Sequence, residues 1–584
     1  MTLVADPSVP ERARRRWFAA AWTAPVWAHL VALALLLVAM MAVVGTASSF
    51  SADEGAAIVQ ARSLSEGAGW LVEHPLPGAD PAGVNYPLEF SEHGRRGWAP
   101  YAKHPLYPLL LAGADRAGGV AAMVLLSLAG TVAAAGLAAA LARRLDRALA
   151  RPALWSTGVA SPLFFDGHLL IAHTLGAALA AAGVLAFLAA LERRSPARAL
   201  LVVPALAACV LLRNEGLFIA AALAAVAGAV ALRRSDVRPV AAVAAVASLV
   251  AGAGAFLLDR EWTARIVGAT DSGPGSVAVP AGSTGLLAGR VKGFLLTWLT
   301  PSYSGRPVLG LLLLVMLAAI AYGALAARRH AGDGRRILAG AGVAAAASVA
   351  ALLVAPGTVV PGLLLAFPLG SAGLFLVSRR TLRTEPARVA AGVSLLFVVA
   401  VVATQYAKGG GGEWGGRYFA VALPIAVPVL LLALRDTATA LGPALARRAG
   451  VALVVCSVAL STMGITALRS SHRANTRLVA AAERAGVSVA AGDRPVMVTT
   501  EGAMPRFAWP TFDRQRWLLA GPEGLDDLFA RLAGAGVARI GFVTRNVDRD
   551  QALLDAAGVR VVSADSSEGG RRWHVLVVDI PCCP

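Results

Sequence analysis

The sequence predicts a polytopic α-helical membrane protein that ends in a small extracytoplasmic α/β domain. Its 584 residues are 57% hydrophobic and 15% charged, with a mean hydropathy of +0.65. A water-soluble protein of this length could not bury so much apolar surface. Apolar runs of roughly 17 to 25 residues recur along the chain and predict about thirteen membrane crossings. After about residue 469 the pattern changes to short β-branched runs separated by helical segments.

The basic segments predict the orientation in the membrane. The first crossing is expected over about 27–47, after "ERARRRW", and it is too long to be a removed signal peptide and lacks a small-residue cleavage site. Further basic segments lie at 142–151, 192–198, 233–238, 327–336, 378–383 and 444–450. Counted from a cytoplasmic N-terminus, all of them fall on the cytoplasmic side, as the positive-inside rule requires. The loops 50–118 and 259–306, and the chain after about 469, then lie outside.

This topology divides the chain into a membrane domain, 1–468, and an extracytoplasmic α/β domain, 469–584. The net charge of +18 does not indicate nucleic acid, because the arginines cluster in short loops between apolar runs. An Ala-rich composition with arginine favoured over lysine is typical of a high-GC bacterial genome. We therefore expect a multi-pass protein of the bacterial inner membrane.

The C-terminal domain is expected to contain four strands and at least two helices. The strands are predicted at 494–500, 538–544, 559–565 and 573–580, with helical patterns in "GLDDLFARLAGAG" and "DRDQALLDAAG" between them. No Gly-rich phosphate fingerprint follows a strand, which argues against a nucleotide site. We expect the domain to cap the membrane domain or to bind an acceptor. The cysteines (Cys209 and Cys456 in crossings, and vicinal Cys582 and Cys583) predict no disulfide framework.

Rare polar residues concentrate on the predicted outer face. The chain has three lysines, Lys103, Lys292 and Lys408, and each lies in an outward segment. Five of the nine histidines lie in or beside the first two outward loops: His74, His93, His104, His168 and His173. A purely structural membrane domain has no use for this asymmetry, so the functional face is expected to be the outer one.

Two of four outward clusters come early in the chain. "FSADEGAAIVQARSL" places Asp53 and Glu54 directly after the first crossing, where they form either a helix N-cap with Ser51 or a catalytic carboxylate pair. "YAKHPLYPLLLAG" places Lys103 just before the next crossing. Its alternative interpretation is a lysine at the membrane interface, next to interfacial tyrosines.

The other two clusters lie at the outer ends of later crossings. "FFDGHLLIAHTLG" and "LLRNEG" contribute Asp166, His168, His173, Arg213 and Glu215. "GGGGEWGGRYF" contributes Glu413, Trp414, Arg417 and Tyr418. Ionisable groups in such apolar surroundings are costly unless they face a polar cavity or one another.

The order of these motifs resembles the GT-C superfamily of polyprenyl-phosphate-sugar-dependent glycosyltransferases. Within it, the chain looks like the relatives of protein O-mannosyltransferases and of lipid A aminoarabinose transferases. The resemblance covers most of the membrane domain and depends on the acidic pair, "KHPLYPLLL", "RNEG" and "WGGRY". Two departures stand out: His104 replaces the first proline of the family's Lys-Pro-Pro, and the acid of the second outer loop could match Asp166 or His173.

The resemblance implies transfer of a sugar from a lipid phosphate to an acceptor hydroxyl, with inversion at the anomeric carbon. Asp53 is then expected to act as the base, and Glu54 to orient the acceptor or pair with a cation. Lys103 and Arg417, with Arg213 behind them, would bind the donor phosphate. Further substrate-binding candidates are His104, Tyr107, Asp166, His173, Glu215, Glu413, Trp414 and Tyr418. The partners would be membrane lipid, the lipid-phosphate sugar and a glycan, lipid or protein acceptor.

Other interpretations stay open at this point. A monophosphate donor requires no cofactor or metal ion, although the histidines leave a divalent metal conceivable without any ligand spacing to support it. A transporter or flippase of a lipid-linked saccharide also suits many crossings with ionisable groups. The concentration of polar residues on one face argues against it, because a transported substrate must be reachable from both sides. A binding scaffold led by the C-terminal domain would not explain the acidic pair.

Overall fold

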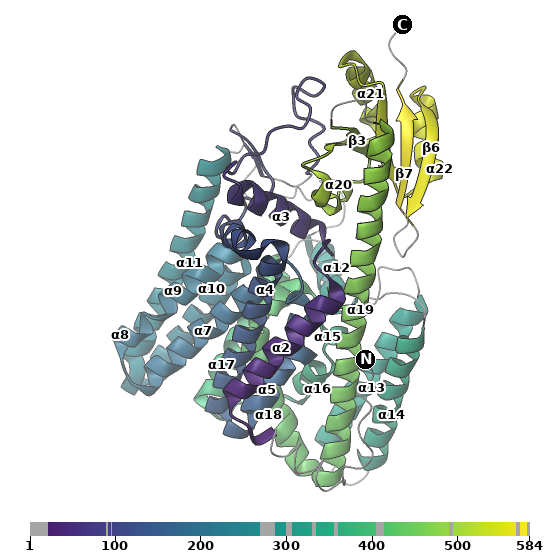
Figure 1. Ribbon diagram of the computed structural model, residues 1–584. Coiled ribbons are helices and arrows are strands. Elements are labelled where there is room, and N and C mark those ends of the chain that lie inside the picture. The colour runs from purple at the N-terminus through teal and green to yellow at the C-terminus, as the bar shows by residue number, and fades with distance from the viewer. Residues whose placement is uncertain are drawn as a thin grey trace.

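The structure is a computed structural model. It describes residues 22–88, 92–94, 96–268, 286–299, 307–329, 334–355, 360–404, 414–489, 494–567 and 573–580. A helical bundle forms most of the molecule, and a small sheet domain stands at one end of it (Figure 1).

Helices account for nearly all of the bundle. Among the described residues, ten helical stretches are long and apolar enough to cross a membrane, so the chain is a multi-pass membrane protein. The α-helices of more than ten residues that build the bundle are α2 (Val26–Val44), α4 (Leu106–Leu145), α7 (His173–Glu192), α9 (Val202–Leu212), α10 (Glu215–Arg233), α11 (Arg238–Val267), α12 (Leu286–Trp298), α13 (Pro307–Arg329), α14 (Gly334–Val354), α17 (Glu385–Thr404), α18 (Leu423–Leu441) and α19 (Pro443–Val489).

The predicted number of about thirteen crossings is not confirmed. Three other apolar segments are divided into shorter helices. They consist of α5 (Ala150–Trp155), the π-turn η2 (Ser156–Ala160) and α6 (Leu163–Asp166); of α8 (Pro196–Ala199) and α9; and of α15 (Leu363–Ala366) and α16 (Pro368–Leu376). Hydropathy averages over such interruptions, so it does not separate a broken helix from a continuous one.

The two long predicted loops contain structure of their own. In 50–118 lie α3 (Ala52–Ser65), the antiparallel pair β1 (Glu92–Gly94) and β2 (Gly97–Ala99), and the start of α4, whose helical dihedrals break at Gly118 and Gly119. In 259–306 lie the last turns of α11 and the whole of α12. Outside these two loops, short 3₁₀ helices connect the longer helices of the bundle: η1 (Arg147–Leu149), η3 (Ser235–Val237) and η4 (Arg417–Ala422).

The C-terminal domain is a five-stranded mixed sheet covered on both faces. The strand order is β4-β3-β5-β7-β6, in which β4, β3 and β5 are parallel and β7 is antiparallel to both neighbours. The elements are β3 (Val496–Thr499), α20 (Met504–Phe507), η5 (Trp509–Thr511), β4 (Arg516–Leu519), η6 (Pro522–Gly524), α21 (Leu525–Gly534), β5 (Arg539–Thr544), α22 (Val547–Ala556), β6 (Arg560–Ser567) and β7 (Trp573–Asp579). Apolar side chains of α21 and α22 pack on one face and those of α19 on the other.

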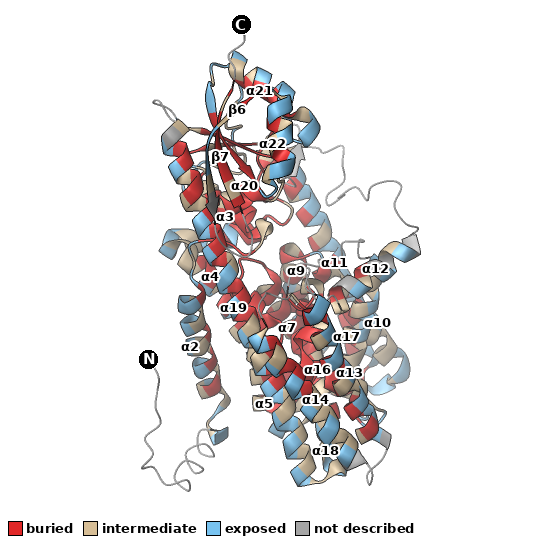
Figure 2. Ribbon diagram, turned by 90° about the vertical axis from the view of Figure 1, so that its right-hand side faces the viewer, coloured by how far each residue is buried: buried red, intermediate tan, exposed pale blue. Residues whose placement is uncertain are grey.

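One helix joins the two parts of the chain. Gly442, at φ 80°, ends α18, and Pro443 then begins α19 as its first residue. From there α19 continues through the predicted domain boundary at 468 and 469, first beside α2, α14 and α16 and then beside the sheet (Figure 1). Buried residues run continuously from the bundle into the sheet domain along this helix (Figure 2).

Candidate functional site

The site is built around α3, at the end of the bundle that faces the sheet domain. Ser51 is the N-cap of this helix, and its hydroxyl accepts a hydrogen bond from the amide of Glu54 at 3.4 Å. The carboxylate of Glu54 accepts in return from the amide of Ser51 at 2.6 Å, which completes a capping box. The N-cap alternative for the acidic pair therefore describes Ser51 and Glu54, and it leaves the carboxylate of Asp53 for other partners.

Glu54 is buried and held by more than the cap. Its carboxylate also accepts from the amide of Phe50 and, across the fold, from the amide of Leu170, both at 2.9 Å. Three backbone donors thus share its two oxygens and join α3 to the segment before α7. These bonds let Glu54 position the helix that carries Asp53. Its predicted role, to orient the acceptor or pair with a cation, stays a prediction.

Asp53 lies between two arginines from distant parts of the chain. Arg417 Nη1 donates to Asp53 Oδ2 at 3.0 Å, and Arg506 Nη1 lies 3.7 Å from Asp53 Oδ1. The Asp53 side chain is still 31% exposed, so it can be reached from outside the protein. Burial raises the pKa of Asp53, but the positive charges of Lys103, Arg417 and Arg506 outweigh burial and hold the pKa well below its usual range.

The segment that carries Lys103 is fixed to the end of α11. Thr263 Oγ1 donates to the carbonyl of Ala102 at 2.8 Å, and His104 Nδ1 lies 3.1 Å from Asp259 Oδ2. His104 is buried, and burial lowers its pKa even though Asp259 acts in the opposite direction. His104 therefore helps to anchor the segment of Lys103 to α11. Lys103 lies between these two anchored residues in the chain, and its ammonium group lies over the ring of Tyr101, 5.0 Å from the ring centroid.

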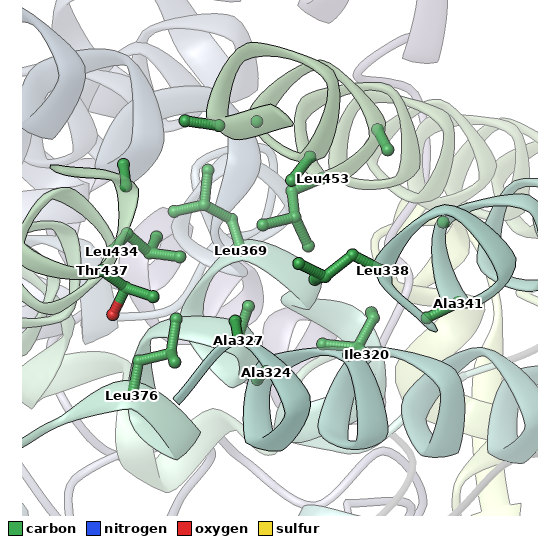
Figure 3. Close-up of a pocket in the computed structure, with 18 of the residues that line it drawn as sticks. Ile320, Ala324, Ala327, Leu338, Ala341, Leu369, Leu376, Leu434, Thr437 and Leu453 are labelled. Carbon is green, nitrogen blue, oxygen red and sulfur yellow. The ribbon is translucent and has the colours of Figure 1, made fainter. Parts of the chain in front are cut away.

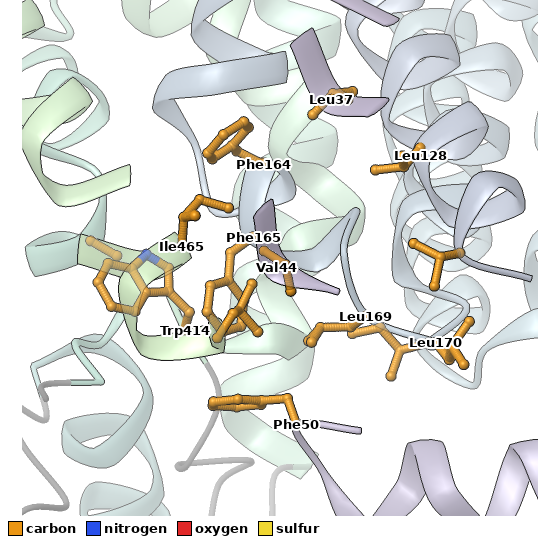
Figure 4. Packing of buried hydrophobic residues seen from close by; sticks show 14 of the residues in the cluster. Leu37, Val44, Phe50, Leu128, Phe164, Phe165, Leu169, Leu170, Trp414 and Ile465 are labelled. Carbon is orange, nitrogen blue, oxygen red and sulfur yellow. The ribbon is translucent and has the colours of Figure 1, made fainter. Parts of the chain in front are cut away.

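A tight turn delivers Arg417 to the site. Gly415 and Gly416 both have positive φ, 72° and 64°, and a Cβ at Gly416 would lie 2.4 Å from the carbonyl oxygen of Thr297. Only glycine fits such a turn without strain. The preceding Trp414 is buried and stacks on Phe165 with ring centroids 5.5 Å apart, as Figure 4 shows. Trp414 thus anchors the turn, and its predicted contact with the substrate stays a prediction.

Arg213 lies in the turn between α9 and α10 and is paired within its own loop. Its Nε and Nη2 donate to the two carboxylate oxygens of Glu215 at 3.0 and 2.6 Å, and both side chains are buried. Arg213 is thus half of a bidentate ion pair. Its role in binding a donor phosphate stays a prediction.

The remaining predicted residues differ in their surroundings. His173 is fully buried at the start of α7 and interacts electrostatically with Lys103, Arg213 and Arg417, and within the described part of the chain no hydrogen-bond partner reaches its ring nitrogens. Asp166 is fully buried in α6. The ring of Tyr107 is buried against Tyr101, and Tyr418 lies beneath the guanidinium of Arg417. The structure does not describe Glu413, Lys408 or the side chain of Lys292.

Sequence reasoning missed two charged groups at this site, Arg506 and Asp259. Asp259 was visible as a charge at the end of an apolar run, but nothing local indicated its partner His104. Arg506 belongs to the C-terminal domain, and no feature of "EGAMPRFAWP" links it to Asp53. Within the described ranges, no three His, Cys, Asp or Glu side chains meet as a metal site requires; the absence of a metal requirement stays a prediction.

An apolar cavity has part of its wall in η4, the 3₁₀ helix that begins with Arg417. It has a volume of about 310 Å³ and is lined by Trp298, Phe419 and apolar residues of α15 to α18. Phe419 follows Arg417 by two residues in η4, so this element contributes both to the charged site and to the wall of the cavity. A second apolar cavity, of about 450 Å³, lies between α13, α14, α16, α18 and α19 around Leu369 and Leu434 (Figure 3). None of the predicted site residues is among the residues that line either cavity.

No protein-family model matches the sequence, and no curated protein matches it at a significant level. Among solved structures, the chain is similar to ArnT from Cupriavidus metallidurans. The apo state has 16% identity and a TM-score of 0.46 over 97% of this chain and 98% of that chain. The same protein bound to undecaprenyl phosphate has 13% identity and a TM-score of 0.49 over 95% and 98%.

The chain is also similar to the archaeal oligosaccharyltransferase AglB from Archaeoglobus fulgidus, in complex with an inhibitory peptide and a dolichol-phosphate. The identity is 14% and the TM-score 0.45, over 90% of this chain and 70% of that chain. ArnT and AglB belong to the GT-C superfamily, the group that the sequence resembles.

Proposed function

We propose that the chain is an inverting glycosyltransferase that moves a sugar from a polyprenyl-phosphate donor to an acceptor hydroxyl on the extracytoplasmic side of the bacterial inner membrane. The observation that carries the proposal is the ion pair of Asp53 with Arg417, joined by the positive charge of Lys103, together with an apolar cavity whose wall includes Phe419 of the same 3₁₀ helix as Arg417. A lipid phosphate needs both surroundings at once, cations for its head and apolar walls for its chain.

The reaction would proceed in one displacement. The acceptor oxygen forms a bond to the anomeric carbon while the bond from that carbon to the phosphate oxygen breaks, and the polyprenyl phosphate leaves with the electron pair. The proton of the acceptor hydroxyl passes to the carboxylate of Asp53. Lys103 and Arg417 stabilise the charge that develops on the leaving phosphate, a contribution that is greatest where water is excluded.

The low pKa of Asp53 fits this sequence of events. A carboxylate surrounded by three cations is a weak base. A bound donor phosphate would share the charge of Lys103 and Arg417, and the pKa of Asp53 would then rise. Asp53 therefore becomes a better base when the donor is present, which favours transfer over proton exchange with water.

The test is transfer by the purified full-length protein. Synthetic polyprenyl-phosphate donors carrying a hexose, an aminoarabinose or an arabinofuranose are incubated with the protein, and free polyprenyl phosphate and glycosylated product are measured by mass spectrometry. We expect release of polyprenyl phosphate with at least one donor, and a large loss in Lys103→Ala and Arg417→Ala. Movement of intact donor across a vesicle membrane without release would instead identify a flippase.

A further inference from the structure

The C-terminal domain contributes a side chain to the site on α3. Arg506 belongs to α20, which follows β3 and packs directly on α3 (Figure 1). Its side chain is only 6% exposed, and its Nη1 lies 3.7 Å from Asp53 Oδ1. Arg417, from the membrane domain, holds the other oxygen of the same carboxylate. The two domains thus hold Asp53 from two sides.

The contact between α3 and the C-terminal domain is close at more than one point. A Cβ at Gly55 would lie 1.8 Å from the carbonyl oxygen of Arg506, so the two backbones touch where Gly55 has no side chain. Seven residues further along α3, the guanidinium of Arg62 lies over the ring of the buried Trp509, 4.6 Å from its centroid. Ala52, at the start of α3, packs against the core of the sheet domain. These contacts fix the place of Arg506.

We propose that Arg506 is a positioning residue of the active site, so that the site is complete only when the C-terminal domain is docked on α3. This inference deepens the proposed function and rests on it. Arg506 orients the carboxylate of Asp53 through Oδ1, and together with Arg417 it keeps Asp53 ionised in the absence of donor.

The charges around Asp53 determine what the loss of Arg506 should do. Lys103 approaches from the segment before α4, Arg417 from η4 and Arg506 from α20, and all three favour the ionised carboxylate. On α3 itself, Glu54 accepts from backbone amides. Removing Arg506 takes away one of the three positive charges, so the pKa of Asp53 rises. As the pH is lowered, turnover that needs the ionised carboxylate should then be lost at a higher pH than in the wild type.

The experiment compares full-length Arg506→Ala, Arg506→Lys and Arg514→Ala in detergent, with a synthetic polyprenyl-phosphate sugar as donor. Arg514 is a matched control, because it lies in the same domain and pairs on the surface with Glu483. In Arg506→Ala we expect kcat to fall at least about tenfold, because the carboxylate of Asp53 is no longer oriented through Oδ1. We also expect the acid limb of the pH–rate profile to move to higher pH, because the pKa of Asp53 rises. Arg506→Lys should restore the acid limb, and Arg514→Ala should match the wild type. An Arg506→Ala profile equal to that of Arg514→Ala would overturn the inference.

A second measurement needs no activity. Melting temperatures of Asp53→Asn, Arg506→Ala and the double variant form a cycle, and a contact between the two residues predicts that the double variant loses less than the sum of the single losses. Additive losses would overturn the inference while leaving the proposed function to the transfer assay. Coupling together with a wild type that uses no lipid-phosphate donor would overturn the proposed function and support the placement of Arg506.

Discussion

Gly55→Ala tests whether the close packing of the two domains matters. Gly55 lies inside α3 with helical dihedrals, where alanine is normally favoured over glycine by about 1 kcal/mol. The added methyl group would, however, lie 1.8 Å from the carbonyl oxygen and 2.7 Å from the carbonyl carbon of Arg506. Because both are backbone atoms, no rotamer change can relieve the contact, and α20 must move away from α3 by about 1.2 Å to reach the 3.0 Å below which Cβ contacts are essentially never seen.

This displacement should cost more than the helix gains. Overpacking of a tight contact costs about 1–3 kcal/mol, and a shift of this size would also lengthen the 3.7 Å contact between Arg506 and Asp53. We therefore expect Gly55→Ala to lower the melting temperature and to reproduce the altered pH profile of Arg506→Ala. Gly113→Ala is the matched control, because Gly113 lies in α4 with no atom within 4 Å of the added methyl group.

The assays are thermal unfolding in detergent and donor turnover between acidic and neutral pH. The control should be as stable as the wild type, or more so, with unchanged turnover. If Gly55→Ala behaves like Gly113→Ala in both assays, the reasoning on domain docking is refuted.

Four other outcomes are expected. Asp53→Asn should lower turnover about 10²–10⁴-fold, while donor binding, measured in a separate assay, is retained. Full turnover in this variant would remove Asp53 as the base. Glu54→Gln should lower the free energy of unfolding by about 1–3 kcal/mol, because its NH₂ group would face one of the three amide donors; lost turnover at unchanged stability would make Glu54 a catalytic group instead. Asp259→Ala should raise the donor KM, because His104 no longer anchors the segment of Lys103, and an unchanged KM would contradict that anchor. A tag at the C-terminus should be accessible on intact spheroplasts and one within 327–336 should not; the reverse labelling would contradict the orientation.

The elements that hydropathy and alternation describe were predicted well. The strands expected at 538–544 and 573–580 agree with β5 and β7 to within one residue at each end. The short strand β4 was missed, because its sequence "RWLL" contains no β-branched residue and does not alternate, whereas the equally short β3 reads "VMVT". The predicted number of about thirteen crossings comes from apolar runs alone, and a hydropathy average does not register where such a run is divided into shorter helices.

The site was predicted only in part, because its residues come from positions far apart in the sequence. Asp53, Lys103 and Arg417 each stood out locally, as charges at the ends of apolar runs. That Asp53 and Arg417 would meet across 364 positions could be expected from topology, which places both at the same membrane face. Arg506 comes from a four-residue helix within a soluble domain, where a single arginine is unremarkable, and only the folded structure reveals its partner.

Because α19 is one continuous helix, the number of residues in it determines how the C-terminal domain is rotated relative to the bundle. Its 47 residues form a rod of about 70 Å that packs in the bundle at one end and under the sheet at the other. Each residue of an α-helix advances the chain by about 1.5 Å and turns it by about 100°. One residue added between the two packed ends would therefore swing α20 around the rod and away from α3. The number of residues in this part of α19, and not only their character, is thus part of what builds the site.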